Sequence, residues 1–383
     1  MNVAERYSFE AEWYDKMSCI LKTFYLYFYP IDNSVELFDR KARKVFLRRS
    51  KCDGLEAKDF FVGGMVNIFS RNLKILDYAD ESTKKKLASS MQRTCAMLKP
   101  DVMDKMGEIL KKITYHNFHI GNIKMVHLTR EQARELYKDR ANYKASDIQN
   151  FMASGLVLVL ELLGENAISK WVELLGPEDP LEAREKSPAS FRACYGTDFI
   201  RNAFHGSANS EAAEKELNFF FPDPKKGQQG PQDTVTLQKC TCCVIKPHAV
   251  QAGHIGDIIE DIQKAGFKIS ALQQFYVDPT NAEEFLEVYK GVLPDYGAMV
   301  AELQSGPCIA MEITHKDQSV DVPIEFRQLC GPMDAEIAKQ LRPQSLRAKY
   351  GKSKVQNAVH CSDLPEDGLL EVEYFFKILA LYG

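Results

Sequence analysis

The stretch TCAMLKPD at residues 94–101 returns later in the chain as CCVIKPHA at residues 242–249. In both copies a short run of apolar or weakly polar side chains ends at a Lys-Pro pair, Lys99–Pro100 in the first copy and Lys246–Pro247 in the second. Such a run is typical of a strand that is buried on both faces. The stretch therefore predicts a buried strand that ends at a Lys-Pro pair, twice in one chain.

The similarity extends outward from this stretch over two long segments. The matching pieces are FMASGLVLVLEL (151–162) with ELQSGPCIAMEI (302–313), WVELLGP (171–177) with FRQLCGP (326–332), SFRACYG (190–196) with SLRAKYG (345–351), and RNAFHGSAN (201–209) with QNAVHCSDL (356–364). The pieces occur in the same order in both segments, which indicates an internal duplication.

Polar stretches mark the domain boundaries. PDPKKGQQGPQDT at 222–234 is rich in proline, glycine and glutamine, and indicates a linker between the two copies. YADESTKKKLASS at 78–90 marks a softer boundary before the first copy. We predict three domains, which cover residues 1–88, 89–222 and 235–383.

Within each copy, predicted strands alternate with predicted helices. The strands are Met91–Leu98, Leu156–Leu162, Cys242–Ile245 and Cys308–Ile313, and Gly107–Thr114 and Gly256–Ala265 have the apolar spacing of helices. We predict an α+β fold in which each copy forms an antiparallel sheet of the split βαβ, ferredoxin-like kind, with helices on one face.

The first domain has a different pattern. FYLYFYPIDNSVELFDRKARKVFLRR at 24–49 alternates aromatic or apolar residues with polar ones around a turn at Pro30–Ser34, which predicts a β-meander. MVNIFSRNLKILDY at 65–78 adds two short strands. The domain is therefore expected to be rich in β-strands, and it holds no evident catalytic residues.

Bulk composition excludes several classes of protein. The 383-residue chain is 45% hydrophobic and 27% charged, which is typical of folded domains. A net charge of −4 provides no general positive field for nucleic acid. The longest apolar run, Leu156–Leu160, is far too short for a bilayer, and MNVAERYSFEAEWYD at the N-terminus lacks the apolar core of a signal peptide. Ten scattered cysteines fit reduced thiols in the cytosol, so we expect no nucleic-acid or membrane partner.

The two copies also share a set of polar residues at equal offsets. An Asn-x-x-His-x-Ser frame occurs at Asn202–Ser207 and again at Asn357–Ser362. An arginine lies ten residues before each asparagine and a glutamate eleven residues after each histidine. A single buried histidine is more often a core residue, but repetition of the whole frame indicates a duplicated site.

At these residues the sequence resembles the nucleoside diphosphate kinases. Lys-Pro-Asp near the start of a module and Asn-x-x-His-Gly-Ser near its end are motifs of that family, and each copy carries both in order, with changes in the second. The order of an aromatic-rich β domain and two kinase modules resembles one subgroup of the family. The N-terminal part of that subgroup is the DM10 domain, which is found in proteins of cilia and flagella.

The resemblance implies a reaction and a role for each repeated residue. The family moves the γ-phosphoryl group of a nucleoside triphosphate to a nucleoside diphosphate through phosphohistidine. His205 and His360 match the nucleophile, and Glu216 and Glu371 match the carboxylate that orients the imidazole ring. The remaining matches are nucleotide- or phosphate-binding residues, namely Lys99, Tyr137, Arg192, Asn202, Ser207, Lys246, Tyr289, Arg327, Arg347, Asn357 and Ser362. Mg²⁺ is implied as a cofactor that arrives with ATP, GTP or another nucleotide, with no protein metal ligands of its own.

The first copy departs from the family mainly in charge. Val172 stands where the second copy has Arg327, a phosphate-binding arginine of the family. Glu178 replaces a family threonine and is expected to bring a carboxylate toward phosphate. Tyr143 is the candidate for the ring that stacks on the base.

The second copy departs from the family mainly in shape. His248 replaces the aspartate of Lys-Pro-Asp, Met333 replaces the threonine, and Cys361 replaces the glycine after the histidine. We expect the Cβ atom of Cys361 to crowd the phosphate or restrict the backbone. Tyr296 is the candidate stacking ring here.

Two further stretches allow alternative interpretations. KCTCCVIK at 239–246 suggests zinc, but a zinc site needs four ligands in paired spacing and no second cysteine pair lies nearby, so buried strand thiols are favoured. RKARKVFLRRSK at 40–51 carries seven basic residues and no acidic one. It is either a solvated strand edge that resists aggregation or an electrostatic patch for an acidic partner such as the tubulin surface.

The sequence therefore predicts a nucleoside diphosphate kinase-like protein of weak to moderate activity. Its expected partners are nucleoside tri- and diphosphates, and tubulin, microtubules or other axonemal proteins. The alternative is a structural component or scaffold of axonemal microtubules with partly decayed kinase sites. The implied location is the cytoplasm and cytoskeleton, in the axoneme of a cilium or flagellum or at the centrosome. We expect the two modules to pack together as an internal pseudo-dimer.

Overall fold

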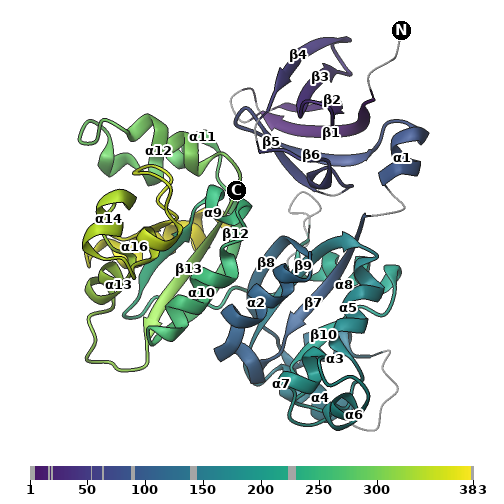
Figure 1. Cartoon of the computed structure of the whole chain (residues 1–383), viewed down its shortest axis with the longest axis vertical. Coiled ribbons are helices and arrows are strands. Elements are labelled where there is room, and N and C mark those ends of the chain that lie inside the picture. Colours follow the sequence, from purple (N-terminus) through teal and green to yellow (C-terminus); the bar gives the residue numbers. More distant parts are fainter. Residues whose placement is uncertain are drawn as a thin grey trace.

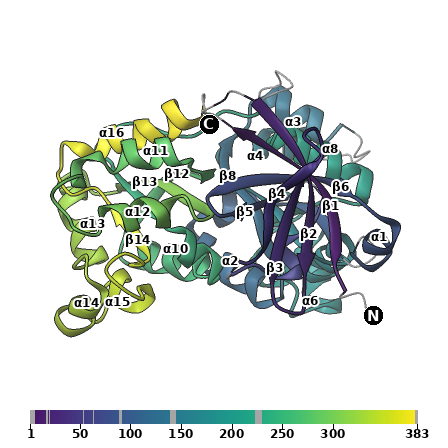
Figure 2. The ribbon, with the colours of Figure 1, turned by 90° about the horizontal axis from the view of Figure 1, so that it is seen from above.

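The computed structural model describes residues 5–15, 18, 20–52, 54–62, 64–87, 91–138, 145–222 and 230–380. A small β domain leads into two larger modules that lie side by side, and Figure 2 looks down on the β domain with the first module beneath it. We call residues 91–222 the first module and residues 230–380 the second module. Tyr143 and most of the predicted linker, residues 223–229, lie outside the described residues.

The N-terminal domain is a six-stranded antiparallel sheet. Its elements are β1 Tyr7–Asp15, β2 Ile20–Tyr29, β3 Ser34–Asp39, β4 Lys44–Lys51, the 3₁₀ turn Ala57–Asp59, β5 Met65–Ile68 and β6 Arg71–Tyr78, followed by α1 Glu81–Leu87. The strand order is β4-β3-β2-β1-β6-β5. The predicted meander is therefore confirmed. Alternate residues of β2, such as Phe24, Leu26 and Phe28, are fully buried in the domain core, as a period of two requires.

The first module repeats strand, helix and strand before it reaches the histidine frame. Its elements are β7 Met91–Leu98, the 3₁₀ helix Pro100–Lys105, α2 Met106–Tyr115, β8 His119–His127, α3 Arg130–Leu136, α4 Ala145–Met152, β9 Leu156–Glu165, α5 Ala167–Leu175, α6 Pro180–Lys186, α7 Phe191–Tyr195, β10 Phe204–Gly206 and α8 Ser210–Phe220. The element order is the one that the duplicated pattern predicts.

The second module has the same order of elements. They are β11 Thr241–Ile245, α9 Pro247–Gln251, α10 Ile255–Lys264, β12 Phe267–Tyr276, α11 Pro279–Phe285, the 3₁₀ turn Glu287–Tyr289, α12 Tyr296–Leu303, β13 Pro307–His315, α13 Val322–Cys330, α14 Ala335–Leu341, α15 Leu346–Tyr350, β14 Val359–Cys361, and α16 Asp367–Glu373, which continues as the π-helical turn Tyr374–Leu379. In neither module is any described helix both long enough and apolar enough to cross a membrane.

The two modules share one eight-stranded antiparallel sheet. The strand order is β10-β7-β9-β8-β12-β13-β11-β14, so equivalent edge strands of the modules, β8 and β12, meet at the centre. They pair at Lys124 and Gln273, and the Gln274 side chain donates to the Gly121 carbonyl over 2.8 Å. The modules are thus packed against each other within one chain.

Helices cover both faces of this sheet, so the prediction of helices on one face is wrong. In β7, Ala96 and Leu98 point toward α2 and α5, whereas Cys95 and Met97 point toward α3, α4 and α8. Both sets are fully buried. The physical reason lies in the strand itself, because an uninterrupted apolar run buries both of its faces only when both are covered.

Two glycines allow the modules to approach closely. Helices α2 and α10 cross at Gly107 and Gly256, which are equivalent positions of the two copies. A Cβ atom at Gly107 would lie 2.1 Å from the backbone nitrogen of Glu260, and one at Gly256 would lie 2.4 Å from that of Lys111. No side chain fits at that distance, so glycine is a steric requirement of the contact.

The residues that directly follow the predicted linker are anchored to the second module. Thr236 donates its backbone N–H and its hydroxyl to Glu312, which is fully buried on β13, and Leu237 donates its backbone N–H to the same carboxylate. A buried carboxylate requires such donors. Thr234, the last residue of the predicted linker, also donates its hydroxyl to the Ser270 carbonyl over 2.5 Å, so the end of that stretch is held against the second module.

Candidate active site

The two histidines occupy the same place in the two modules. His205 is the central residue of β10 and His360 that of β14, which are the outer strands of the shared sheet. Each strand follows an alanine with positive φ, Ala203 at 67° and Ala358 at 70°. Left-handed backbone is unfavourable for alanine, so a strained turn that recurs in both copies is a specific feature of the site.

A glutamate on the following helix contacts each imidazole. His205 Nε2 lies 3.0 Å from Glu216 Oε2, and His360 Nε2 lies 2.9 Å from Glu371 Oε2. The carboxylate also accepts a hydrogen bond from the serine of the frame, over 2.6 Å from Ser207 and 2.7 Å from Ser362. The predicted His-Glu-Ser groups are therefore assembled in both modules.

The Glu371 contact has an electrostatic consequence for His360. Burial by itself lowers the pKa of the imidazole, but the Glu371 carboxylate outweighs it and the net pKa is raised. The contact also favours a proton on Nε2, which directs the lone pair of the neutral ring to Nδ1. Each histidine is more than nine-tenths buried.

The Lys-Pro lysines lie beside the frame asparagines. Lys99 Nζ donates to Asn202 Oδ1 over 2.6 Å, and Asn202 in turn donates to the Glu178 carbonyl over 2.9 Å. In the second module Lys246 Nζ donates to the Val355 carbonyl over 3.0 Å, and Asn357 donates to the Met333 carbonyl over 2.9 Å. Both asparagines thereby hold the loop in which the family threonine is replaced.

Lys246 is held in an unfavourable environment. Its side chain is buried, and burial together with the nearby Arg347 lowers the pKa of Lys246 to about 7, against an opposing effect of Glu302. An ammonium group in such a place lacks a counter-charge of its own. A phosphate group would supply that charge.

The arginines ten residues before the asparagines are equivalent in position. Arg192 donates to the Gly176 carbonyl over 2.7 Å, and Arg347 donates to the Gly331 carbonyl over 2.8 Å. Arg347 also donates through Nε to the Val359 carbonyl next to His360, over 3.1 Å. Both guanidinium groups are nearly buried and are held in place by backbone oxygens.

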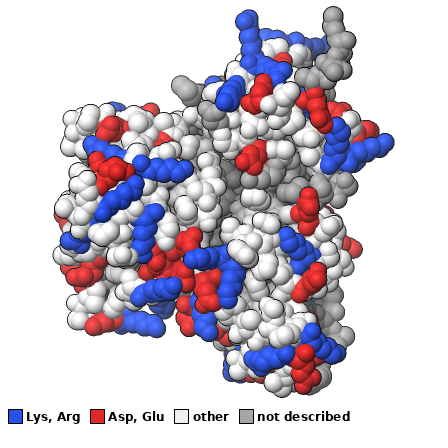
Figure 3. Space-filling model, viewed as in Figure 1, with Lys and Arg blue, Asp and Glu red and all other residues white. Residues whose placement is uncertain are grey.

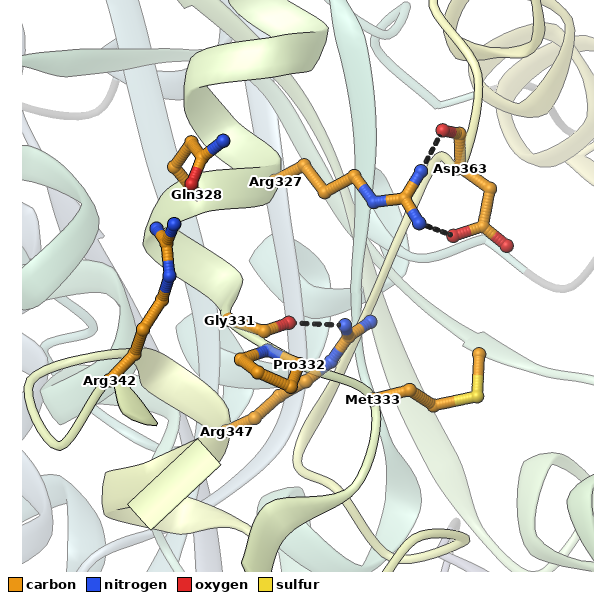
Figure 4. A pocket seen from close by; sticks show the side chains of 8 residues that line it. All are labelled: Arg327, Gln328, Gly331, Pro332, Met333, Arg342, Arg347 and Asp363. Atoms are coloured by element: carbon orange, nitrogen blue, oxygen red, sulfur yellow. Dashed lines mark hydrogen bonds and ion pairs between the residues drawn. The ribbon is translucent and has the colours of Figure 1, made fainter. Parts of the chain in front are cut away.

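Arg327 takes part in an ion pair that only the second module has. Its guanidinium pairs with Asp363, at 3.3 Å from NH2 to Oδ1, and also donates to the Asp363 carbonyl. Figure 4 shows this pair at the rim of a pocket of about 220 Å³, with the Arg347 guanidinium beside it. The first module has Val172 and Ala208 at the two positions, so the entire ion pair is replaced there.

The two predicted tyrosines have different environments. The Tyr137 ring packs edge-on against His205, with 5.6 Å between centroids. Tyr289 instead donates its hydroxyl to Asp363 over 2.5 Å, and Phe285 provides the edge-on ring against His360, at 5.0 Å. Tyr296, the predicted stacking ring, bonds to the Glu283 carbonyl over 3.3 Å. The sequence shows each tyrosine but not which ring reaches the histidine.

The Cys361 side chain points away from the open side of His360, so the expected crowding of the phosphate is not seen, and the expected restriction of the backbone stays a prediction. Successive residues of a strand point to opposite faces, and Cys361 points into the core beside Phe326 and Cys330. In the first module a Cβ atom at Gly206 would lie 2.7 Å from Trp171, which occupies the position of Phe326. The smaller ring makes room for the larger residue.

Sequence reasoning missed three residues that contact the predicted site, namely Asp363, Phe285 and Glu302. Asp363 directly follows the Asn-x-x-His-x-Ser frame and differs from its counterpart Ala208, so comparison of the copies would have found it. Phe285 is one of several aromatic residues in its region. Glu302 lies 54 residues from its partner His248, a separation that carries no local signal.

The donor set suits a phosphate chain better than a metal. Lys99 contacts Asn202, three residues before His205, and Arg347 contacts the Val359 carbonyl next to His360. Lysine, arginine and asparagine side chains bind phosphate oxygens. Over the described parts of the chain, no group of three or more histidine, cysteine, aspartate or glutamate side chains is arranged to hold a metal ion. Every cysteine that the structure describes is a free thiol, and Cys242 and Cys243 on β11 are buried, as predicted.

Comparison with known proteins defines the class. The family model described as nucleoside diphosphate kinase matches residues 92–225 and 239–380, so the chain belongs to the nucleoside diphosphate kinase family. It is 48% identical to nucleoside diphosphate kinase homolog 7 of Rattus norvegicus over 379 residues, which is 99% of this chain and 94% of the rat protein. The protein of that name from Mus musculus is 47% identical over equal shares. These matches confirm the predicted family and subgroup.

More distant relatives match a smaller share of the chain. A thioredoxin domain-containing protein 6 from Xenopus laevis is 36% identical over 82% of this chain and 47% of its own length. Among solved structures, the nucleoside diphosphate kinase of Aquifex aeolicus is 39% identical, with a TM-score of 0.34, and covers 34% of this chain and 96% of its own.

Proposed function

We propose that the chain transfers the γ-phosphoryl group of a nucleoside triphosphate to a nucleoside diphosphate through a phosphohistidine. The observation that carries this proposal is the buried histidine held at Nε2 by a glutamate in each of two modules. In each module the lysine and the arginine of the repeated set are held by neighbouring loops. Neutral imidazole with a defined tautomer is a nucleophile at neutral pH.

The residues support a balanced two-step reaction. In the first step Nδ1 of His360 forms a bond to the γ-phosphorus, the bond to the bridging oxygen breaks, and the nucleoside diphosphate leaves with that electron pair. Glu371 holds the Nε2 proton throughout and stabilises the charged ring. In the second step the terminal oxygen of another nucleoside diphosphate forms a bond to the same phosphorus, the bond from phosphorus to Nδ1 breaks, and its electron pair returns to Nδ1.

The cationic side chains position the phosphates during both steps. Phosphoryl transfer depends on orientation and on positive charge around the equatorial oxygens. Lys246 and Arg347 provide that charge from buried positions, and Arg327 adds a third charge from the pocket rim. Mg²⁺ bound to the nucleotide phosphates would neutralise their remaining charge. Asn357 and Tyr289 hold the surrounding segments in place through bonds to the Met333 carbonyl and to Asp363.

We further propose that the second module is the more active one. It retains the Arg327–Asp363 pair, whereas the first module has Val172, which is 44% exposed, and Ala208. The exposed Glu178 adds negative charge to the first module only. Total activity is therefore expected to be weak to moderate and to come mainly from His360.

The test is the labelling of full-length chain with ATP that carries a radioactive γ-phosphate. We expect an acid-labile label in the wild type, a large loss in His360→Ala, a smaller loss in His205→Ala and complete loss in the double variant. His127→Ala serves as the control, because His127 is exposed at the end of β8 and far from both frames in sequence. A wild-type chain that takes up no label would overturn the proposal.

A second candidate function rests on the surface of the N-terminal domain. The predicted basic stretch forms the turn before β4 and β4 itself, which is one of the two edge strands of its sheet. Arg40 and Arg49 pair with Glu10 and Asp32. The exposed basic residues for which the described structure shows no ion pair are Lys41, Arg43, Lys44 and Arg48. Lysine and arginine side chains gather at the top of Figure 3, where Figure 1 shows β4.

We propose that this basic edge docks the chain on an acidic protein surface such as that of tubulin, in the cytoskeleton of a cilium or flagellum or at the centrosome. Exposed like charges on an edge strand also prevent aggregation, so the test must separate the two roles. We expect replacement of Lys41, Arg43, Lys44 and Arg48 by glutamine to abolish co-sedimentation with microtubules. The matched control replaces Lys186, Lys264, Lys339 and Lys352. Equal co-sedimentation of both variants would contradict the docking role.

A further inference from the structure

The residue after the Lys-Pro pair differs between the modules but accepts a hydrogen bond from the equivalent backbone N–H group. In the first module Asp101 Oδ2 accepts the backbone N–H of Ala203 over 3.0 Å. In the second module His248 Nε2 accepts the equivalent N–H of Ala358 over 3.2 Å. Ala203 and Ala358 are the positive-φ residues from which the histidine strands start. A histidine has therefore replaced a carboxylate as the acceptor that holds this turn.

The tautomer of His248 follows from its other partner. Its Nδ1 lies 2.6 Å from Glu302 Oε1, and its backbone N–H also donates to that oxygen over 3.1 Å. A carboxylate can only accept, so Nδ1 carries the proton and Nε2 keeps the lone pair that the Ala358 N–H requires. His248 and Glu302 are both more than nine-tenths buried.

Hydrogen bonds hold the Glu302 side chain in place and stabilise its negative charge. Gln356, two residues before Ala358, donates to Glu302 Oε2 over 3.1 Å. Burial would raise the pKa of Glu302, but the bonds from His248 and Gln356 outweigh it and the pKa is lowered. The first module has Phe151 and Arg201 at the positions of Glu302 and Gln356, with the guanidinium 5.7 Å from the ring centroid. The three residues of the second module thus form a set that the first module lacks.

We propose that His248, held by Glu302, is a positioning residue for the nucleophile His360, and that it makes phosphorylation of the second module sensitive to acid in a way that the first module is not. The inference rests on the proposed function. When His248 gains a proton on Nε2, two N–H groups face each other and the strained turn loses its acceptor. Asp101 keeps an acceptor oxygen even when it is protonated, so the turn of the first module keeps its bond.

The groups that face His248 come from several elements. Glu302 comes from α12, and Lys246 at the start of α9 itself lies close enough to Glu302 for their charges to interact. Gln356 and Ala358, from the loop before β14, contribute an amide and a backbone N–H, neither of which titrates. The loop after α9 turns His254 away, toward Tyr350 and Asp257. Strand β13, which packs on α9, begins with Pro307 and the buried Cys308.

The experiment measures the rate of phosphohistidine formation against pH in two full-length backgrounds. His205→Ala reports the second module and His360→Ala reports the first. Protonation of the nucleophile gives both modules an acid limb with a slope of one. We expect the slope to approach two in the second module only, because a second proton binds to His248. Equal slopes in the two backgrounds would overturn the inference.

Substitutions separate the positioning role from folding. His248→Asn supplies an amide oxygen for Ala358 and an amide donor for Glu302 but does not titrate, so we expect a slope of one and a rate within about threefold of its parent at pH 7.5. His248→Ala removes the acceptor, and we expect about a tenfold lower rate at every pH. An acid limb that is as steep in His248→Asn as in its parent would contradict the proposal. Thermal unfolding across the same pH range monitors folding of each variant.

A second measurement is independent of activity. Nitrogen-15 NMR of histidine-labelled full-length chain distinguishes a protonated from an unprotonated ring nitrogen, and the signals of His248 are those that vanish in His248→Asn. We expect a proton on Nδ1 and none on Nε2 at neutral pH. A proton on Nε2 would overturn the inference even if the chain took up no label. Absence of label with the expected tautomer would instead overturn the proposed function alone.

Discussion

Arg327 on α13 is paired with Asp363, the residue that directly follows the histidine frame of the second module, and the first module has lost both partners together. The loss is selective, because Lys99, Arg192, Asn202 and Glu216 all remain in place around His205. Removal of one partner alone would leave an unpaired charge at the rim.

Val172→Arg with Ala208→Asp is expected to restore the pair in the first module. In the His360→Ala background, labelling of His205 should rise at least about tenfold, because a guanidinium would again face the transferred phosphate. Val172→Arg alone should give a smaller gain, since nothing would hold the new side chain. The reciprocal change in the second module, Arg327→Val with Asp363→Ala, should lower labelling of His360 by a similar factor. An unchanged rate in both double variants would mean that the pair has no part in transfer.

Gly206 and Trp171 are expected to behave as a coupled pair. Gly206→Cys should lower the free energy of unfolding by about 1–3 kcal/mol, because its Cβ atom would lie 2.7 Å from the Trp171 ring. Trp171→Phe in the same chain should recover part of that loss, as Phe326 does beside Cys361. Urea denaturation of the two single variants and the double variant gives the coupling energy. Strictly additive effects would contradict the packing explanation.

The crossing of α2 and α10 is expected to tolerate no side chain at its centre. Gly107→Ala or Gly256→Ala should destabilise the chain by about 3 kcal/mol, because each new Cβ atom meets helix backbone and not a movable side chain. Gly297→Ala is the matched control, since Gly297 lies in α12 with open space around it and alanine favours the helix. Calorimetric unfolding compares the three. Equal stability of Gly107→Ala and Gly297→Ala would show that the helices can separate without cost.

Lys246 is expected to make stability rise with pH. Its pKa is about 7 in the folded chain and about 10.4 in an unfolded one, so above pH 7 the unfolded state binds more protons. The free energy of unfolding should therefore increase as pH rises from about 7 to about 10, and the cost of the buried charge, a few kcal/mol by order of magnitude, is complete below pH 7. Lys246→Met should be more stable than the wild type at pH 7 and should lose this slope. Lys352→Met, at an exposed position, should keep the wild-type slope.

Local patterns predict the elements of this chain well. The apolar run before each Lys-Pro pair forms β7 and β11, and the predicted helix spacing forms α2 and α10 within about one residue at each end. The offsets of arginine, asparagine, histidine and glutamate also predict which side chains meet, because a histidine and a glutamate in successive elements of a compact module face the same turn. The duplication supplies a second copy of each such pattern as an internal check.

Contacts across long separations were beyond the reach of the sequence. His248 and Glu302 lie 54 residues apart, and the role of the histidine follows only from the distance between them. The direction of the Cys361 side chain depends on the pleat of β14 and on the size of Phe326, neither of which is visible in the frame itself. For the same reason the sequence shows a change at this position but does not show where the new side chain points.

The amino-acid sequence by itself therefore determined the class of the protein, the duplication and the residues of the two histidine frames, since these depend on short-range order along the chain. The tertiary structure decided how the modules join through β8 and β12, which faces of the sheet are covered, and which neighbour each site residue touches. These properties come from packing, in which residues far apart in the chain fill space against one another and form hydrogen bonds with one another. The pairing of His248 with Glu302 and the loss of the Arg327–Asp363 counterpart in the first module are of this second kind.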